Sequence, residues 1–135
     1  IASESGVKDL TGFDNCKKLT WLELAYCYKL ENIDALAGCD GLKYLNISFT
    51  SVQDFSPIEE TELERFVCMG TKVPKSEKRS FADSHPACIC VIEGSQPFGY
   101  GWRYNDQGRT FFEYYIKMRE IFRYEDKEYF GNTKE

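Results

Sequence analysis

The chain has 135 residues, about the length of one domain, and its 42% hydrophobic and 29% charged residues are ordinary for a globular protein. Its formal net charge of −5 argues against a nucleic-acid-binding protein, which would carry a basic patch. No apolar run approaches the roughly 18–20 residues of a membrane span, so we expect no membrane-spanning segment in this sequence.

The apolar pattern Leu-x-x-Leu-x-Leu occurs three times between residues 19 and 68, with starts 23 and 21 residues apart. Its members are Leu19, Leu22 and Leu24, then Leu42, Leu45 and Ile47, then Leu63, Phe66 and Cys68. Alternating apolar residues predict a short strand with one buried face. Repetition at a fixed period predicts a solenoid whose units pack on one another.

The second half of each unit has apolar residues three positions apart, which favours a 3₁₀ or short helical turn. They are Leu30, Ile33 and Leu36, then Val52, Phe55 and Ile58. Asp9, Asn32 and Asp54 occupy matched positions, where a short polar side chain can accept backbone N–H groups. Val7, Leu10 and Phe13 match the same half-unit, so we expect the chain to begin inside a repeat of a longer protein.

The unit that runs from Leu42 to Ile58 resembles a leucine-rich repeat, and most closely the short repeats of bacterial internalins. The resemblance covers about residues 7–93. It implies an α/β leucine-rich-repeat solenoid, a horseshoe fragment with a parallel sheet on its concave side and helical turns on its convex side. Cys27, Thr50 and Thr71 stand where such repeats usually have Asn, so we expect the turn to survive with altered hydrogen bonding.

The third unit changes after Val73, and Pro74 follows. Residues 75–84 are predicted to form a short polar helix with Phe81 facing inward and Ser76 as its N-cap. Residues 87–93 are predicted to form a strand, which makes a fourth, atypical rung. We align His85, Cys88 and Cys90 with the three ladder positions, so that Cys90 stacks on Cys68. Residues 1–93 are therefore assigned to the repeats.

Residues 94–135 differ in composition, since they hold 12 of the 21 aromatic residues and seven charges of each sign. Residues 94–108 are rich in turn residues, and Thr110 to Glu113 form a capping box that opens a helix to about Tyr124. Together with the sequence from His85, this segment resembles the C-terminal ending of leucine-rich-repeat proteins from gut Firmicutes, which are similar to secreted or surface-attached proteins. We predict a C-terminal capping segment made of a loop and a helix.

The strand residues that alternate with the leucines should point to the concave face. We predict a partner-binding surface there, because aromatic residues and Arg are enriched at interface hot spots. Its residues are Trp21, Glu23, Tyr26, Tyr44, Asn46, Phe49 and Arg65. The alternative is that part of this face is core, and we expect burial for the third and fourth rungs, which carry Val67, Met69, Ile89 and Val91.

The six cysteines and the one histidine do not form a recognisable catalytic or metal-binding motif. Cys16 and Cys39 lie at matched positions, so a disulfide between them is geometrically possible, although free thiols in repeat positions are the favoured interpretation. His85, Cys88 and Cys90 lack a fourth ligand for zinc. The acidic run 59–64 is interpreted as a solvated loop that can attract a basic partner. We predict no catalytic residue, cofactor or metal.

The predicted function is a non-enzymatic protein–protein or ligand-binding module that binds through the concave face, on the surface of a bacterial cell or outside it. One alternative is a structural C-terminal segment of a larger surface protein whose binding site lies elsewhere. A second is glycan binding on an aromatic platform formed by Trp21 and Tyr44. A cytoplasmic location is the alternative to the cell surface.

Overall fold

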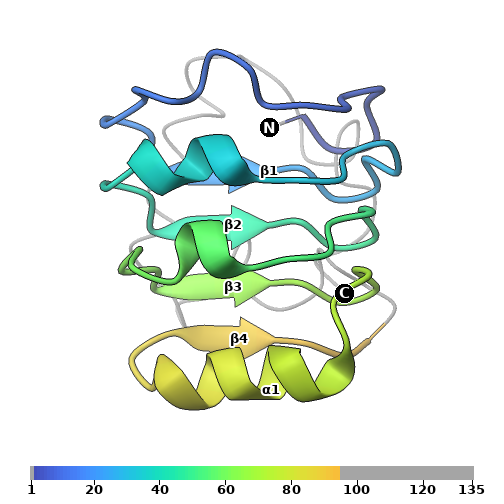
Figure 1. The fold of residues 1–135 in the computed structure, drawn as a ribbon, viewed down its shortest axis with the longest axis vertical. Coiled ribbons are helices and arrows are strands. Elements are labelled where there is room, and N and C mark those ends of the chain that lie inside the picture. The colour runs from blue at the N-terminus through green and yellow to red at the C-terminus, as the bar shows by residue number, and fades with distance from the viewer. Residues whose placement is uncertain (1, 95–135) are drawn as a thin grey trace, which may run out of the picture. The chain divides into compact units, whose positions relative to one another are not determined.

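The computed structural model describes residues 2–94, which form a solenoid of coils around one parallel sheet (Figure 1). The strands are β1 (Trp21–Glu23), β2 (Tyr44–Asn46), β3 (Arg65–Val67) and β4 (Ile89–Val91). The sheet order is β1-β2-β3-β4, and every neighbouring pair is parallel. Each strand therefore pairs with the strand of the next coil, as a leucine-rich-repeat solenoid requires.

The convex side carries one short helical element after each of β1, β2 and β3, drawn in front of the strands in Figure 1. Two are 3₁₀ helices, η1 (Asp34–Gly38) and η2 (Ser56–Ile58), and the third is an α-helix, α1 (Lys75–Ser84). None of the helices in the described part of the chain is long and apolar enough to cross a membrane.

The core lies between the sheet and these helical elements and consists of the repeated apolar residues. Leu22, Leu45 and Phe66 face it from the three central strands and are at most 5% exposed. Leu30, Ile33, Leu36, Val52 and Ile58 face it from the convex side and are fully buried. The alternating and the three-residue patterns thus bury opposite sides of one continuous core, as predicted.

Short polar side chains begin three of the convex segments, as predicted from their matched positions. The carboxylate of Asp9 accepts the N–H of Thr11 at 3.1 Å, the amide oxygen of Asn32 accepts that of Asp34 at 3.3 Å, and Asp54 accepts that of Ser56 at 2.9 Å. Each bond satisfies a backbone donor that the short turn leaves open. The bonds from Ser56 also hold the pKa of Asp54 below its usual value.

The residues in the ladder position also bond backbone, as predicted. The hydroxyl of Thr50 donates to the carbonyl of Ile47 at 2.8 Å, and that of Thr71 donates to the carbonyl of Cys68 at 3.1 Å. The thiol of Cys27 instead donates across to the carbonyl of Ala2 at 3.2 Å, in the partial first coil. A threonine closes its own turn, whereas the cysteine ties two coils together.

The predicted register of the fourth strand is wrong by two residues. Cys90 pairs with Phe66 and not with Cys68. The reason is that α1 is longer than the 3₁₀ helices of the other coils, so β4 begins 24 residues after β3, compared with 23 and 21 for the earlier intervals. A slip of two residues keeps every side chain on its own face, so Cys88 and Cys90 still pack against the core.

Helix α1 has the predicted bounds and buries Phe81, but its N-cap is Pro74 and no side chain caps it. Ser76 is therefore not the N-cap. The carbonyl of Pro74 instead accepts the N–H groups of Glu77 and Lys78, both at 3.0 Å.

The chain divides into two compact units, residues 1–95 and residues 96–135. The predicted capping helix falls in the second unit, outside the described residues.

His85 follows α1 and joins it to the preceding coil. Its Nδ1 lies 2.7 Å from the carbonyl oxygen of Phe81, and its Nε2 lies 2.7 Å from that of Glu59. Two carbonyl acceptors need two N–H donors, which only the protonated ring provides. Burial lowers the pKa of His85, but the bonds to Glu59 and Phe81 more than offset it, so the pKa is raised.

We expect the stability of the chain to fall as the pH rises through the raised pKa of His85. Its pKa is higher when folded than in the unfolded chain, so its contribution is complete below the unfolded value of about 6.5 and is lost above the folded value. The loss should be about one hydrogen bond, roughly 1 kcal/mol. Urea unfolding from pH 5.5 to 8.5 measures it.

The matched control is His85→Gln, which cannot titrate. The difference in the free energy of unfolding between the two proteins should shrink as the pH rises. Parallel curves over the whole pH range would show that His85 does not act as a protonated bridge.

Candidate functional site

The strand register brings the predicted concave residues into columns. Trp21 pairs with Tyr44, and Tyr44 pairs with Arg65, while Glu23 pairs with Asn46 in the next column. The column arrangement that the repeat alignment predicts is therefore confirmed. It follows from parallel pairing in register, which stacks matched positions of successive coils.

The exposure expected of these side chains is wrong for five of the seven. Trp21 is 8% exposed, Arg65 is 2% exposed, and Glu23, Tyr44 and Asn46 are fully buried. Burial lowers the pKa of the Arg65 guanidinium, although nearby Tyr44 and Cys88 partly offset this effect.

The expected burial of the third and fourth rungs holds for one of them only. In the third, Val67 and Met69 are fully buried, whereas in the fourth Ile89 is 53% exposed.

The aromatic platform considered for glycan binding is also not formed as predicted. The rings of Trp21 and Tyr44 meet edge to face, with centroids 5.5 Å apart and planes at 67°. A sugar ring needs an open flat face, and these two buried rings do not present one.

Tyr26, Tyr28 and Phe49 form a cluster at the carboxyl ends of β1 and β2, which we call the aromatic edge. The rings of Tyr26 and Phe49 are stacked, with centroids 5.0 Å apart and planes at 8°. Tyr28 lies beside Tyr26, with ring centroids 6.0 Å apart, and is 66% exposed. Tyr26 and Phe49 are half-buried, so the aromatic edge keeps accessible surface where the strand columns do not.

The backbone at the aromatic edge is unusual. Tyr26 has φ = 63° and Phe49 has φ = 57°. These values lie in the left-handed region, which residues other than Gly and Asn rarely adopt. The matched residue of the next coil is Gly70, with φ = 68°, and that of the partial first coil is Glu4, with φ = 61°. Each coil therefore needs a left-handed residue where the strand turns toward the convex side.

Bonds between coils hold this conformation. The N–H of Tyr26 donates to the carbonyl of Ser48, and that of Phe49 donates to the carbonyl of Met69, both at 2.8 Å. Burial raises the pKa of Tyr26, with smaller contributions from Tyr28 and Glu4, so its hydroxyl is a neutral donor at physiological pH. The aromatic edge thus offers flat apolar rings and phenol hydroxyls.

The cysteines carry no recognisable site in the described part of the chain. All six thiols are free, and Cys16 and Cys39 donate to the carbonyls of Gly12 and Phe13 at 3.8 and 3.3 Å. Burial raises the pKa of Cys68 to about 12, which keeps its thiol protonated and unreactive. Within residues 2–94, no group of three or more His, Cys, Asp or Glu side chains is arranged to hold a metal.

No protein-family model and no curated protein matches the chain. Among solved structures, an internalin (inlF) of Listeria monocytogenes str. 4b F2365 superposes with a TM-score of 0.57 at 20% identity, over 72% of this chain and 30% of its own. Internalin C2 (inlC2) of the same strain gives a TM-score of 0.46 at 21% identity, over 73% of this chain and 54% of its own. The fold is a leucine-rich-repeat solenoid of the internalin kind.

Sequence reasoning misses two features of the aromatic edge. Tyr28 is outside the predicted surface because it lies past the strand, on the turn. The left-handed conformation of Tyr26 and Phe49 is missed too, although Gly70 at the matched position signals it. A Gly in one copy of a repeat indicates the backbone conformation that the other copies adopt.

Gly70 should be intolerant of a side chain because the ring of Phe49 lies directly over it. A Cβ on Gly70 would overlap the Cδ1 and Cε1 atoms of that ring, and its φ is left-handed. We expect Gly70→Ala to lower the free energy of unfolding by about 1–3 kcal/mol.

A double-mutant cycle with Phe49→Ala separates the two causes. In that background the overlap is gone and only backbone strain remains, so the loss from Gly70→Ala should fall to about 1 kcal/mol. Urea denaturation of the four proteins gives the coupling. An equal loss in both backgrounds would mean that the ring does not pack on Gly70.

Proposed function

We propose that the chain is a non-catalytic protein-binding module whose accessible contact surface is the aromatic edge. The observation that carries this proposal is the pair Tyr26 and Phe49 in left-handed backbone, where Gly70 serves the next coil. Such a conformation costs an ordinary residue roughly 1–2 kcal/mol. Stacking returns about 0.5–1.5 kcal/mol, so folding alone gives little reason to prefer two aromatics over two glycines there.

The chemistry of the aromatic edge suits a protein partner. Rigid aromatic side chains bury much area at a low cost in conformational entropy, and Tyr is enriched at hot spots. Tyr28 is largely exposed. Lys29, which follows it in sequence, is also exposed, as is Glu4, which occupies the position of Tyr26 in the partial first coil. An apolar centre with a polar rim is the usual arrangement of a protein interface.

The second candidate is a structural segment of a larger protein whose binding site lies elsewhere. The burial of Trp21 and Tyr44 favours it, because these are the central residues of the predicted concave surface. In both candidates we propose that residues 94–135 form a C-terminal cap, supported by the resemblance of this segment to the C-terminal endings of other leucine-rich-repeat proteins. The five buried residues remain proposed contacts only for a partner that uncovers them.

We propose a bacterial cell-surface or extracellular location, supported by the resemblance of the repeats to those of internalins. The six free thiols support the cytoplasmic alternative, since disulfides form mainly in oxidising compartments.

Photo-crosslinking tests the aromatic edge even while the partner is unidentified. Benzoylphenylalanine replaces Tyr28 in the full-length protein, which is illuminated in the cell that expresses it. We expect one discrete adduct, which mass spectrometry identifies as another protein. The same group at Lys17, an exposed residue of the first coil, is the control and should give no such adduct.

Competition then separates the two candidate functions. Unlabelled wild-type chain should suppress the adduct at least fivefold more effectively than Phe49→Gly, which keeps the left-handed backbone but removes the ring. Equal suppression by the two proteins would mean that the aromatic edge does not bind. If crosslinking gives no adduct from position 28 or position 17, the result would favour the second candidate, a structural segment whose binding site lies elsewhere.

A further inference from the structure

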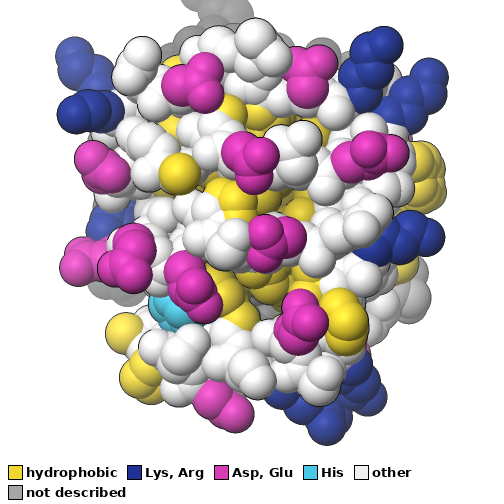
Figure 2. Space-filling model, in the orientation of Figure 1, with side chains coloured by type: hydrophobic (Ala, Val, Ile, Leu, Met, Phe, Trp, Pro, Cys, Tyr) yellow, Lys and Arg dark blue, Asp and Glu magenta, His cyan; other side chains and the backbone are white. Residues whose placement is uncertain are grey.

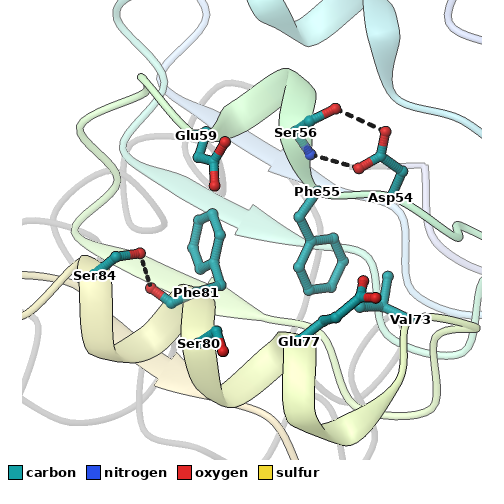
Figure 3. Close-up of a pocket in the computed structure, with 9 residues that line it drawn as sticks. All are labelled: Asp54, Phe55, Ser56, Glu59, Val73, Glu77, Ser80, Phe81 and Ser84. Carbon is teal, nitrogen blue, oxygen red and sulfur yellow. Dashed lines mark hydrogen bonds between the residues drawn. The ribbon is translucent and has the colours of Figure 1, made fainter.

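The convex side carries a pocket that the predicted function does not use. It lies between η2 and α1 and has a volume of about 380 Å³ (Figure 3). Phe55, Val73 and Phe81 form its floor, while Asp54, Glu59 and Glu77 stand around its rim. Its lining contains none of the three residues of the aromatic edge.

The floor is apolar and rigid. Phe55 and Phe81 are each 6% exposed and Val73 is 4% exposed. The two rings meet edge to face, with centroids 5.7 Å apart, and both pack against Phe66 in the core. A floor fixed in this way accepts an aliphatic or planar group with little rearrangement.

The rim is acidic. Asp54, Glu59 and Glu77 are exposed, and no Lys or Arg lines the pocket. Figure 3 shows Glu59 entering from the η2 side and Glu77 from α1, with the two phenyl rings between them. Asp54 is held ionised, since Ser56 donates both its N–H and its hydroxyl to that carboxylate, at 2.9 and 2.7 Å.

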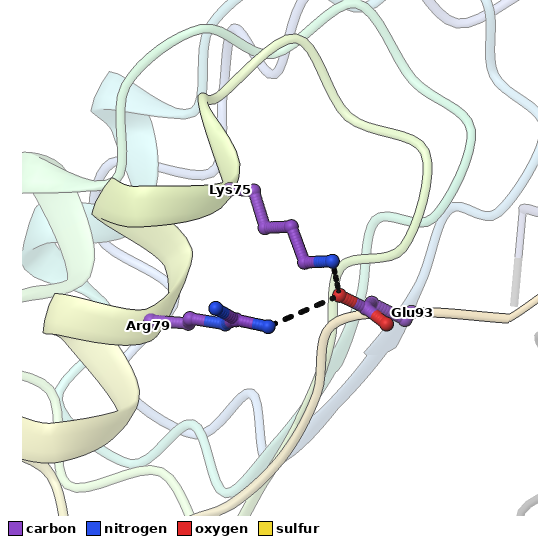
Figure 4. Close-up of polar contacts among 3 residues, drawn as sticks. All are labelled: Lys75, Arg79 and Glu93. Carbon is purple, nitrogen blue, oxygen red and sulfur yellow. Dashed lines mark ion pairs between the residues drawn. The ribbon is translucent and has the colours of Figure 1, made fainter.

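Helix α1 keeps its cations away from this rim. Lys75 and Arg79 lie one turn apart on another face of the helix and pair with Glu93, the Arg79 contact being 3.7 Å (Figure 4). The third cation of α1, Lys78, is 7% exposed and does not line the pocket. The ring of His85 stacks on Phe81, and its nitrogens face two carbonyl oxygens. The charged residues that line the pocket are the three carboxylates, and together with a protonated His85 beside them they carry a formal charge of −2.

The wider convex face has the same sign. Figure 2 shows Asp and Glu side chains across the middle of this face, Lys and Arg toward its margins, and hydrophobic side chains at the bottom of the hollows between coils. A field of this sign attracts cationic groups.

We propose that this pocket binds an arginine side chain of a protein partner. Arginine combines a three-carbon apolar stem with a planar cation, which matches an apolar floor below carboxylates. Its guanidinium offers five N–H donors in a fixed fork, so it can serve several rim carboxylates at once and lie against an aromatic ring. Lysine offers one compact charge and matches the spread of the three carboxylates less well.

The test uses the full 135-residue chain and short capped peptides, Ac-Gly-Arg-Gly-NH₂ as ligand and its lysine and citrulline analogues as controls. Binding is followed by ¹⁵N–¹H NMR shifts. The arginine peptide should shift the amides of Glu59, Ser80 and Phe81 with a Kd of about 1 mM, as expected for one side chain. The citrulline peptide, which has the same shape without the charge, should bind at least tenfold more weakly.

Matched variants locate the site. Glu59→Gln with Glu77→Gln should weaken arginine binding about fivefold or more, because two carboxylates lose their charge. Glu62→Gln with Glu64→Gln changes the net charge equally, in the same acidic run but outside the pocket, and should change the Kd less than twofold. If the first double variant loses its folded NMR spectrum, the single Glu77→Gln variant replaces it, with an expected weakening of about twofold to threefold.

Several results would overturn the proposal. Equal affinity for the citrulline peptide would show that charge is not recognised, and equal affinity for the lysine peptide would remove the assignment to arginine. An equal effect of the two double variants, or shifts centred away from η2 and α1, would show a diffuse acidic surface and no pocket.

Discussion

The structure depends on one constraint, the in-register parallel pairing of each strand with the strand of the coil before it. Pairing stacks Leu22, Leu45 and Phe66 into one apolar column and places the residues between them in columns on the other face. No single coil has a core of its own, so the free energy gained per coil comes from its neighbours. The period of two along each strand explains why β4 tolerates a shift of two residues and would not tolerate one.

Features that depend on local chemistry were predictable from the sequence. The turn caps of Asp9, Asn32 and Asp54, the hydroxyl bonds of Thr50 and Thr71 and the bounds of α1 all follow from residues within a few positions of each other. The same is true of the strand columns, because the repeat itself carries their alignment.

Features that depend on the length or surroundings of a coil were not predictable in this way. The register of β4 depends on how many residues α1 adds to its coil, which an alignment on Cys68 does not contain. Repeat position predicts which way Trp21 and Tyr44 point, but burial depends on everything that surrounds them. The left-handed residues have no single residue type, since Glu, Tyr, Phe and Gly share the position, so their common conformation is hidden in the sequence.

The turn caps on the convex side have a consequence for how this protein can change. Each cap satisfies a donor of its own segment, so a convex segment is closed locally and makes few demands on the coils beside it. The α1 coil changes its convex segment even without a side-chain cap, since a ten-residue α-helix replaces the shorter 3₁₀ helices of its neighbours while the sheet continues. The convex segments can therefore differ in length and sequence while the parallel sheet stays the same, so new surface chemistry can arise there without any change in the core.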